Sequence, residues 1–475
     1  MKLPKQSEDF PGWYQAVVRD AGMAESSMVR GTMVIKPWGY AVWERIQAGV
    51  DRRIKATGHE NLYFPLFIPM HLLEREAEHV EGFAPEVAVV THGGGQKLEE
   101  PLAVRPTSET IIWATYAKWI QSYRDLPLLY NQWANVVRWE MRPRLFLRTT
   151  EFLWQEGHTA HETAEEAIRE ALMILDDVYR ATMVEDLAMP VLTGRKSASQ
   201  RFPGAVETYC LEGLMRDGRS LQAGTSHYLG QNFAKAYDVQ FLSRQGTQEY
   251  AYATSWGVTT RLVGGVIMTH GDDKGLRLPP RLAPVQVVVV PIYRSDDERS
   301  AVLEAADRLA ASLDGVRVKV DAREEHRPGY KFNEWELKGV PLRLEIGPRE
   351  VQERTAALAR RDTGTKLTVA WDALPGLVPG LLDEVQQGLL DQAATFRDEH
   401  THRPDSYDEL IALMKASEGG FAETGWCGDP ACEERVKADS KATIRLLPVE
   451  PAAPGGPCIV CGRPATDLAT WATAY

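Results

Sequence analysis

The spacing of hydrophobic positions in the N-terminal part of the chain predicts one long helix followed by an extended segment. Across residues 37–57 the apolar positions recur at helical spacing and form one stripe, made of Trp38, Val42, Ile46, Val50 and Ile54. Pro37 suits a first helical turn, and Gly58 suits the C-terminal cap. The apolar run 62–70 contains two prolines, which belong at strand ends or in edge strands. A helix followed by an edge strand is suited to an interface between subunits, although packing within the core explains the stripe equally well.

Farther along the chain, the pattern predicts strands that are mostly joined without helices. Residues 128–141 and 146–155 have the character of two strands joined by a short loop, and residues 258–269 alternate as a strand does. Residues 165–187 have the periodicity of an amphipathic helix. Because few helical crossovers separate the strands, we expect an antiparallel sheet with flanking helices, an α+β fold.

Two proline-rich breaks, at residues 278–284 and 374–380, divide the rest of the chain. Between them strands and helices alternate, which predicts an α/β domain. Its predicted strands cover 285–292, 317–320 and 342–346, and its predicted helices cover 296–313 and 330–338. We therefore expect three domains, at residues 1–280, 284–395 and 396–475.

The bulk composition excludes some classes of protein. Hydrophobic residues make up 44% of the chain and charged residues 25%, which is ordinary for a globular protein. No apolar run reaches the roughly 18 residues that cross a bilayer, and residues 1–10 lack a secretion signal. We therefore expect a cytoplasmic protein without a membrane partner. The net charge of −12 argues against indiscriminate nucleic-acid binding but is compatible with a specific RNA partner.

Four of the five cysteines are clustered near the C-terminus. They form a Cys-x4-Cys pair and a Cys-x2-Cys pair, namely Cys427, Cys432, Cys458 and Cys461. In a cytosolic chain such a cluster indicates a metal site rather than disulfides, and four thiolates match a structural Zn²⁺ site. Two unrelated pairs of reduced cysteines are the alternative. Cys210 stands alone and is most simply a small buried hydrophobic residue.

Charged side chains recur inside the apolar, strand-like runs between residues 105 and 261. Burying such groups is costly unless they meet a partner or a ligand. Arg138 and Glu140 leave the same face of one predicted strand, and Arg148 and Phe152 lie on its predicted partner. Guanidinium groups bind phosphate oxygens, a carboxylate accepts from an adenine amino group, and an aromatic ring stacks on the base. The set suits a nucleoside triphosphate, with a ladder of surface ion pairs as the alternative.

These residues carry a resemblance to a known family. Residues 138–152 resemble motif 2 of the class II aminoacyl-tRNA synthetases, residues 257–261 resemble motif 3, and residues 37–69 resemble motif 1, the dimer element. Motif 3 has fewer glycines before its arginine than the wider class. The strings RPTSE, RWE, FLWQEGH, QAGTSHYLG, SWGVTTR and PGYKFNEWELKG resemble the prolyl-tRNA synthetases, in their archaeal and eukaryote-like form. His158 and Ser255 are too close in the sequence to accommodate the editing insertion of the bacterial form.

The resemblance implies a set of roles in binding ATP together with Mg²⁺. Arg138 would contact the α-phosphate and the substrate carboxylate, and so serve catalysis. Glu140 would bind adenine, with Phe152 stacked on it. The outer phosphates and the rest of the nucleotide would contact Arg148, Gln222, Thr259, Thr260 and Arg261.

The resemblance also implies a site for L-proline. Thr107 and Glu109 would hold the charged imino group. The pocket wall would consist of Phe83, Trp154, Glu156, His158, Phe202, His227 and Ser255. Taken singly, each of these aromatic residues and histidines is more simply a core residue.

By the same resemblance the middle domain binds the anticodon of tRNA(Pro), and the protein is a homodimer. In the 331–347 segment, Glu336, Arg343 and Glu345 alternate with apolar residues and are candidates to contact unstacked bases. The C-terminal Tyr475 would fold back toward the active site, whereas a docked terminus is the alternative.

Three other functions fit fewer of these observations. A synthetase for another amino acid, such as threonine, would need catalytic zinc ligands that have no evident match here. A non-catalytic relative would have lost one of the motif residues, namely Arg138, Glu140, Arg148 or Arg261, and this chain keeps all four. A zinc-dependent nucleic-acid-binding module would account for the cysteines but not for the arginine-rich strands.

Overall fold

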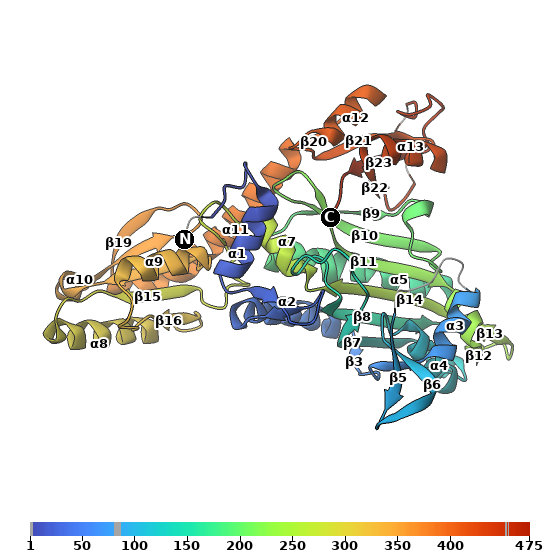
Figure 1. The fold of residues 1–475 in the computed structure, drawn as a ribbon, viewed down its shortest axis with the longest axis horizontal. Coiled ribbons are helices and arrows are strands. Elements are labelled where there is room, and N and C mark those ends of the chain that lie inside the picture. The colour runs from blue at the N-terminus through green and yellow to red at the C-terminus, as the bar shows by residue number, and fades with distance from the viewer. Residues whose placement is uncertain (1–2, 80–86, 452–453, 455) are drawn as a thin grey trace.

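The fold was taken from a computed structural model, which describes residues 3–79, 87–451, 454 and 456–475. Three larger sheets, each with its own helices, occupy separate regions in Figure 1. The central region is formed mainly by residues before 280, the region on the left by residues 287–373, and the region at the top by the C-terminal residues. A long helix, α11 (Leu374–Glu399), runs between the last two regions.

The central sheet has seven strands in the order β3-β7-β8-β14-β11-β10-β9. The strands are β3 (Glu60–Asn61), β7 (Leu128–Val137), β8 (Glu151–His161), β9 (Val191–Arg195), β10 (Glu207–Leu214), β11 (Ser220–Gly230) and β14 (Tyr252–Thr259). All neighbours are antiparallel except the short β3, which runs parallel to β7. The predicted antiparallel sheet is thus confirmed.

Helices cover this sheet and enclose the largest core of the molecule. They are α1 (Phe10–Asp20), α2 (Pro37–Ala56), α5 (Ala164–Met173), the π-helical segments η2 (Ile174–Arg180) and η3 (Thr182–Asp186), and α7 (Arg261–His270). The predicted helix at 37–57 is confirmed as α2, and its stripe from Val42 to Ile54 is fully buried in this core. Packing within the core therefore accounts for that part of the stripe.

Smaller elements surround the central sheet. A three-stranded sheet contains β4 (Phe67–Pro69), β5 (Ala88–Gly93) and β6 (Gln96–Val104), with α3 (Met70–His79), α4 (Glu109–Trp119) and α6 (Asn232–Tyr237) beside it. Two short hairpins are β1 (Ala24–Ser26) with β2 (Met33–Ile35), and β12 (Gln240–Leu242) with β13 (Gln248–Tyr250). Single 3-10 turns are η1 (Tyr123–Asp125) and η4 (Ala198–Gln200).

Three sequence-based element assignments were wrong in part. Residues 261–269, predicted as strand, form the helix α7; all positions from Leu262 to His270 are buried, so no polar face marks the helical period. The strand predicted at 146–155 begins only at Glu151, because the connection from β7 is longer than expected. The helix predicted at 165–187 changes to π-helical turns after Met173.

The second region contains the three strands and two helices predicted for it, together with two strands and one helix that were not predicted. Its sheet order is β16-β15-β17-β18-β19, with β15 parallel to β16 and β17 and the remaining pairs antiparallel. The strands are β15 (Val287–Pro291), β16 (Val318–Val320), β17 (Leu342–Ile346), β18 (Thr355–Arg360) and β19 (Lys366–Ala370). The helical elements are α8 (Asp296–Ser312), α9 (Pro328–Leu337), α10 (Pro348–Glu353) and η5 (Trp371–Ala373).

The C-terminal region is a four-stranded sheet with two helices. Its strands lie in the order β20-β21-β23-β22. The elements are β20 (Thr401–His402), α12 (Tyr407–Lys415), β21 (Phe421–Trp426), α13 (Pro430–Ser440), β22 (Thr443–Leu446) and β23 (Asp467–Ala472). This region touches the central sheet at its β9 edge, where Leu447 forms a bridge with Arg195 (Figure 1). None of the helices in the described ranges combines the length and apolar character of a membrane span.

Candidate active site

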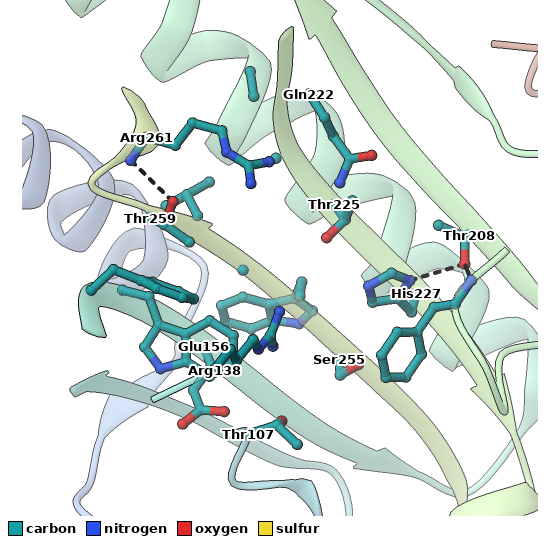
Figure 2. Close-up of a pocket in the computed structure, with 18 of the residues that line it drawn as sticks. Thr107, Arg138, Glu156, Thr208, Gln222, Thr225, His227, Ser255, Thr259 and Arg261 are labelled. Atoms are coloured by element: carbon teal, nitrogen blue, oxygen red, sulfur yellow. Dashed lines mark hydrogen bonds between the residues drawn. The ribbon is translucent and has the colours of Figure 1, made fainter. Parts of the chain in front are cut away.

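A cavity of about 610 Å³ opens on the central sheet, and Figure 2 shows side chains from several of its strands pointing into it. It brings together most of the residues predicted from the sequence: Thr107, Glu109, Arg138, Glu140, Arg148, Phe152, Trp154, Glu156, His158, Phe202, Gln222, His227, Ser255, Thr259 and Arg261. Thr260 is fully buried and is not one of the lining residues. Phe83 lies outside the described residues.

Two guanidinium groups, those of Arg138 and Arg261, face this cavity (Figure 2). The Nε of Arg138 donates to the carbonyl of Pro106 at 2.9 Å, and that of Arg261 to the carbonyl of Leu147 at 3.2 Å. Desolvation, followed by repulsion from Arg148 and Arg138, lowers the pKa of Arg261 to about 10, so it stays charged at neutral pH. Arg138 and Arg261 thus repel each other within one cavity, and an anion bound beside both would offset that repulsion.

The motif around Arg138 is not a pair of facing strands. Arg138 and Glu140 follow the end of β7, and Arg148 precedes β8, so all three lie in the connection between the strands. Glu140 accepts from the backbone nitrogen of Arg142 at 2.7 Å and lies 3.9 Å from Arg148 Nε. Of the two residues expected to contact adenine, Glu140 therefore lies on this loop, whereas Phe152 lies on β8.

Arg138 is also held by aromatic rings. Its guanidinium carbon lies 5.7 Å from the ring centre of Phe152 and 5.4 Å from that of Trp154. Desolvation lowers the pKa of Arg138, while the carboxylates of Glu109 and Glu156 oppose the change. The group lines an open cavity, so solvent reaches it and the charge is retained. The cation–π contacts and the nearby carboxylates together fix the orientation of the Arg138 guanidinium group.

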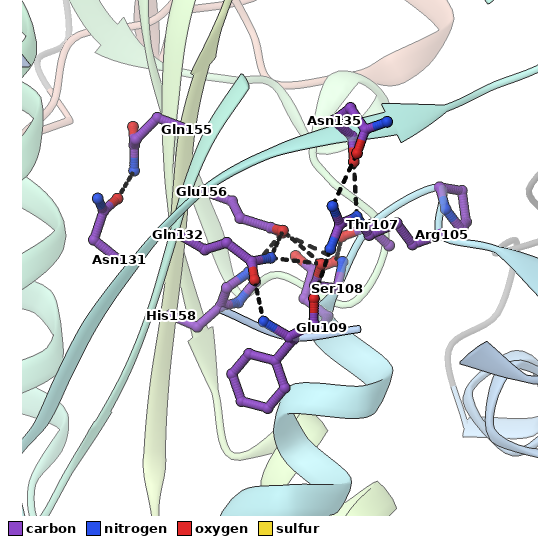
Figure 3. Close-up of polar contacts among 12 residues, drawn as sticks. Arg105, Thr107, Ser108, Glu109, Asn131, Gln132, Asn135, Gln155, Glu156 and His158 are labelled. Atoms are coloured by element: carbon purple, nitrogen blue, oxygen red, sulfur yellow. Dashed lines mark hydrogen bonds and ion pairs between the residues drawn. The ribbon is translucent and has the colours of Figure 1, made fainter. Parts of the chain in front are cut away.

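A buried polar network holds Glu156 at the start of α4 (Figure 3). Ser108 Oγ donates to Glu156 at 2.5 Å, Gln132 Nε2 donates at 2.8 Å, and His158 Nε2 lies 3.0 Å away. Burial favours the neutral forms of both groups, but their pairing raises the pKa of His158 and, with Ser108 and Gln132, lowers that of Glu156. The Glu156 carboxylate is thus occupied by protein partners. Gln132 was not predicted from the sequence, because nothing except its place on β7 marks it as part of the site.

Glu109 and Thr107 lie next to this network. Thr107 Oγ1 donates to Glu109 Oε2 at 2.5 Å, and both side chains are buried and line the cavity. Arg105, in contrast, is fully buried and satisfied by protein groups alone, through the carbonyls of Phe64 and Asn135 and the Asn135 side chain. The RPTSE string therefore combines a structural arginine with two groups that face the cavity.

His227 and Phe202 form the opposite wall. Their ring centres are 4.7 Å apart, and Nδ1 of His227 lies 3.0 Å from Thr208 Oγ1. Burial, with a smaller contribution from His158, lowers the pKa of His227 to about 3, so this ring is neutral at physiological pH. Ser255 Oγ, Trp154 Nε1 and His158 Nδ1 are buried without a hydrogen-bond partner among the described residues. Buried polar atoms of this kind need a partner, which a ligand in the cavity would supply.

The C-terminal cysteines converge as predicted. The four Sγ atoms of Cys427, Cys432, Cys458 and Cys461 all lie within 4.8 Å of one another. That of Cys427 is 3.7 Å from Cys432 and 3.6 Å from Cys461. A tetrahedral zinc site with Zn–S bonds of about 2.3 Å sets its sulfurs roughly 3.8 Å apart, so the four thiols fit such an ion. Cys210 is buried elsewhere, as expected, and burial raises its pKa to about 11.

The three anticodon candidates do not form one group. Arg343 and Glu345 lie together on β17, where Arg343 Nη2 donates to Glu345 at 3.0 Å and stacks on the ring of Phe332. Lys366 pairs with the other Glu345 oxygen at 2.6 Å. Glu336, at the end of α9, pairs instead with Lys274 of the central region. Arg343 is the candidate with an aromatic neighbour suited to stacking.

The chain terminus docks beside the cavity. The hydroxyl of Tyr475 donates to Asp217 at 2.6 Å, and its backbone nitrogen donates to the carbonyl of Ser220. The ring lines a second cavity of about 540 Å³, which shares Leu147 and Thr149 with the first. Tyr475 is not one of the residues that line the first cavity.

Comparison with known proteins assigns these regions to families. Residues 90–270 match the tRNA synthetase class II core domain (G, H, P, S and T), residues 286–381 the anticodon binding domain, and residues 407–475 the C-terminal domain of prolyl-tRNA synthetase. The chain is 54% identical over 478 residues to the proline–tRNA ligases of Roseiflexus sp. (strain RS-1) and Chloroflexus aurantiacus (strain ATCC 29366 / DSM 635 / J-10-fl). Each alignment covers 100% of this chain and 99% of the relative. The proline–tRNA ligase of Chlorobium luteolum (strain DSM 273 / BCRC 81028 / 2530) is also 54% identical to the chain, over 484 residues.

Proposed function

The chain belongs to the prolyl-tRNA synthetases, and from that premise we propose that the cavity on the central sheet holds ATP and proline side by side. The activity of the protein is the ATP-dependent ligation of proline to tRNA. One observation carries the assignment of the site: the paired guanidinium groups of Arg138 and Arg261 face the same cavity as the buried carboxylate of Glu109. The first two suit a polyphosphate, and the third suits an imino cation.

The nucleotide occupies the end of the cavity that contains Arg261 and the loop residues. Arg138 binds the α-phosphate and the proline carboxylate, and Arg148 and Arg261 bind the outer phosphates. Glu140 and Phe152 contact adenine. Gln222 and Thr259 line the rest of the nucleotide site. Thr260 acts indirectly, since it is buried at the start of α7. Mg²⁺ bound to the phosphates would neutralise charge that develops on their oxygens.

Proline occupies the end near Glu109 and His227. Thr107 and Glu109 hold the imino group, and the ring lies among Trp154, Phe202 and His227. Glu156 and His158 act by positioning Ser108 and the start of α4, because Glu156 is already paired. The Ser255 hydroxyl gains a partner when the cavity is filled.

No nucleophile from the protein is required for this chemistry. The proline carboxylate attacks the α-phosphorus and displaces pyrophosphate. The terminal ribose hydroxyl of tRNA then attacks the carbonyl of the adenylate, loses its proton and displaces AMP. Alignment of two bound reactants supplies about 7–11 kcal/mol of the barrier reduction. Two arginines placed beside the phosphates stabilise the charge in the transition state.

The other regions serve tRNA binding, assembly and stability. We place domain boundaries at residues 1–280, 284–395 and 396–475, with the anticodon of tRNA(Pro) bound by the second domain through Arg343. Tyr40, Tyr63 and Phe67 expose apolar surface on the segment that resembles motif 1, which supports a homodimer. Structural Zn²⁺ is held by the four clustered cysteines. We infer a cytoplasmic location, since tRNA, ATP and proline are all present there.

The decisive experiment is ATP–pyrophosphate exchange with each of the twenty amino acids. We expect proline to support the fastest exchange by a wide margin. Exchange supported best by another amino acid would refute the proline site, and the absence of exchange with all twenty would refute the adenylate mechanism.

A further inference from the structure

The segment 195–203 lies between the C-terminal domain and the cavity, and it forms part of the cavity wall. Its cavity-lining residues are Lys196, Gln200, Arg201, Phe202 and Pro203. The segment begins at the last residue of β9, the edge strand of the central sheet. That sheet therefore supports only one side of the segment. Its conformation therefore depends on what packs against the other side.

The C-terminal domain supplies that support through one buried carboxylate. Glu433, on α13, is 3% exposed and accepts two hydrogen bonds from the segment. Ser197 Oγ donates to its Oε1 at 3.0 Å, and Ser199 Oγ donates to its Oε2 at 2.7 Å. Next to them, Arg195 and Leu447 exchange two backbone hydrogen bonds of 2.8 Å. One side chain of the C-terminal domain thus holds Ser197, directly before the turn Ala198–Gln200, and Ser199, its middle residue.

A second link passes through a buried ion-pair cluster. Glu212, on β10, is fully buried and is paired with Lys196 at 2.8 Å and with Arg445 of the C-terminal domain at 2.7 Å. Lys196 also donates to the backbone carbonyl of Arg445 at 3.1 Å. Although burial opposes the charge, the two cations lower the pKa of Glu212 to about 2. Removing one member of such a cluster leaves a buried charge without its partner, which is costly.

From this supported turn, hydrogen bonds lead directly to the proline side of the cavity. The backbone nitrogen of Lys196 donates to the carbonyl of Thr208, and that of Phe202 donates to Thr208 Oγ1 at 3.0 Å. The same hydroxyl contacts His227 (Figure 2), and the ring of His227 packs on Phe202. A shift of Ser197 and of the turn Ala198–Gln200 is therefore passed to both rings of this wall.

We propose that Glu433 and Arg445 are positioning residues for proline binding, through which the C-terminal domain shapes the amino-acid side of the active site. The inference rests on the proposed function, specifically on the assignment of Phe202 and His227 to the proline pocket. No hydrogen bond among the described residues leads from Glu433 to Arg138 or Arg261 on the nucleotide side, whereas the charges of Arg445 and Glu212 do act on Arg261. Removal of Glu433 is therefore the change that affects the two substrates differently.

The test compares Glu433→Ala with Glu434→Ala by proline-dependent ATP–pyrophosphate exchange in the full chain without tRNA. Glu434 is the matched control, because it is the next residue on α13, is 69% exposed at its side chain and pairs only with Lys437 among the described residues. For Glu433→Ala we expect the KM for proline to rise about ten-fold, since small displacements of positioned groups cost up to about 100-fold. The kcat and the KM for ATP change less than about two-fold.

Phe202→Ala, measured in parallel, tests the assignment of the proline pocket separately from the support by the C-terminal domain. A raised KM for proline in Phe202→Ala together with an unchanged KM in Glu433→Ala overturns the support by the C-terminal domain and leaves the pocket assignment intact. An unchanged KM in Phe202→Ala overturns the pocket assignment and the inference with it. Equal increases in Glu433→Ala and Glu434→Ala also overturn the inference, because Glu434 does not contact the segment.

Ser199→Ala provides the second variant should Glu433→Ala fail to fold. It removes one donor from the exposed middle residue of the turn and leaves the C-terminal domain unaltered. We expect the KM for proline to rise several-fold, again with kcat preserved, and an unchanged value overturns the proposal. Combined with Glu433→Ala, the two effects should be less than additive, as for residues that act through one contact.

Discussion

Arg138 and Arg261, which are far apart in the sequence, face the same cavity closely enough for the charge of one to lower the pKa of the other. Arg138 follows the end of β7, and Arg261 begins α7 directly after β14. Because β8 lies between β7 and β14 in the sheet, the fold brings both side chains to one end of the strands. A phosphate chain placed there meets two cations that have no other anionic partner at salt-bridge distance among the described residues.

Replacing Arg138 tests this relationship. We expect Arg138→Ala to reduce proline-dependent ATP–pyrophosphate exchange by at least about 1,000-fold, because it removes an interaction with the reacting phosphate. Arg142→Ala, an exposed change in the same loop, is the control and should retain exchange. Circular dichroism would confirm the fold of both variants. Near-normal exchange in Arg138→Ala would refute the assignment.

Recognition of tRNA is expected to depend on Arg343 but not to affect activation. Arg343→Ala should reduce the rate of tRNA charging roughly ten-fold and leave pyrophosphate exchange unchanged, since β17 is remote from the cavity residues. The exposed Arg349, which pairs with Glu353 in the same domain, offers a matched control. An equal loss of both activities in Arg343→Ala would contradict a role restricted to tRNA.

The four clustered cysteines are expected to bind one metal ion per chain. Cys461→Ser should lower the zinc content measured by elemental analysis and lower the temperature of unfolding, because a closed site contributes to folding. Cys210→Ala, at a buried cysteine outside the cluster, should keep the full metal content. Equal metal content in the two variants would exclude a four-thiolate site.

Stability is expected to fall below neutral pH in part because of His270. Burial lowers the pKa of this ring to about 3, so the folded state keeps it neutral while the unfolded chain takes up a proton near pH 6.5. The unfolded state then binds more protons, and the free energy of unfolding decreases as pH drops below 6.5, by about 1.4 kcal/mol per pH unit. His270→Gln should show a shallower pH dependence in urea unfolding between pH 6.5 and 5. Identical slopes for both proteins would contradict this contribution.

The enzyme is expected to activate alanine by mistake. A pocket shaped for proline discriminates against a smaller side chain by only about 10–200-fold per methylene group. Pyrophosphate exchange with alanine should therefore be measurable, and addition of tRNA(Pro) should yield no AMP beyond the one AMP released with each alanyl-tRNA formed, since the sequence between His158 and Ser255 is too short for an editing insertion. Robust tRNA-dependent hydrolysis would show a correction site.

Sequence patterns were sufficient where the signal is local. The stripe of α2, the strand Leu342–Ile346 and the alternation of strands and helices after residue 284 were predictable because burial on one side repeats at a fixed period. The motif strings likewise pointed to Arg138 and Arg261, which the fold brings to one cavity, and to four cysteines whose sulfur atoms converge.

Only the tertiary structure decided which polar groups are left for ligands. Glu156 is paired with Ser108, Gln132 and His158, and Arg105 is satisfied by backbone carbonyls, although both resemble ligand-binding residues in the sequence. The helix α7 and the contacts of Glu433 with Ser197 and Ser199 were equally unpredictable. A fully buried helix has no amphipathic period, and a hydrogen bond between residues more than 200 positions apart leaves no mark in local spacing.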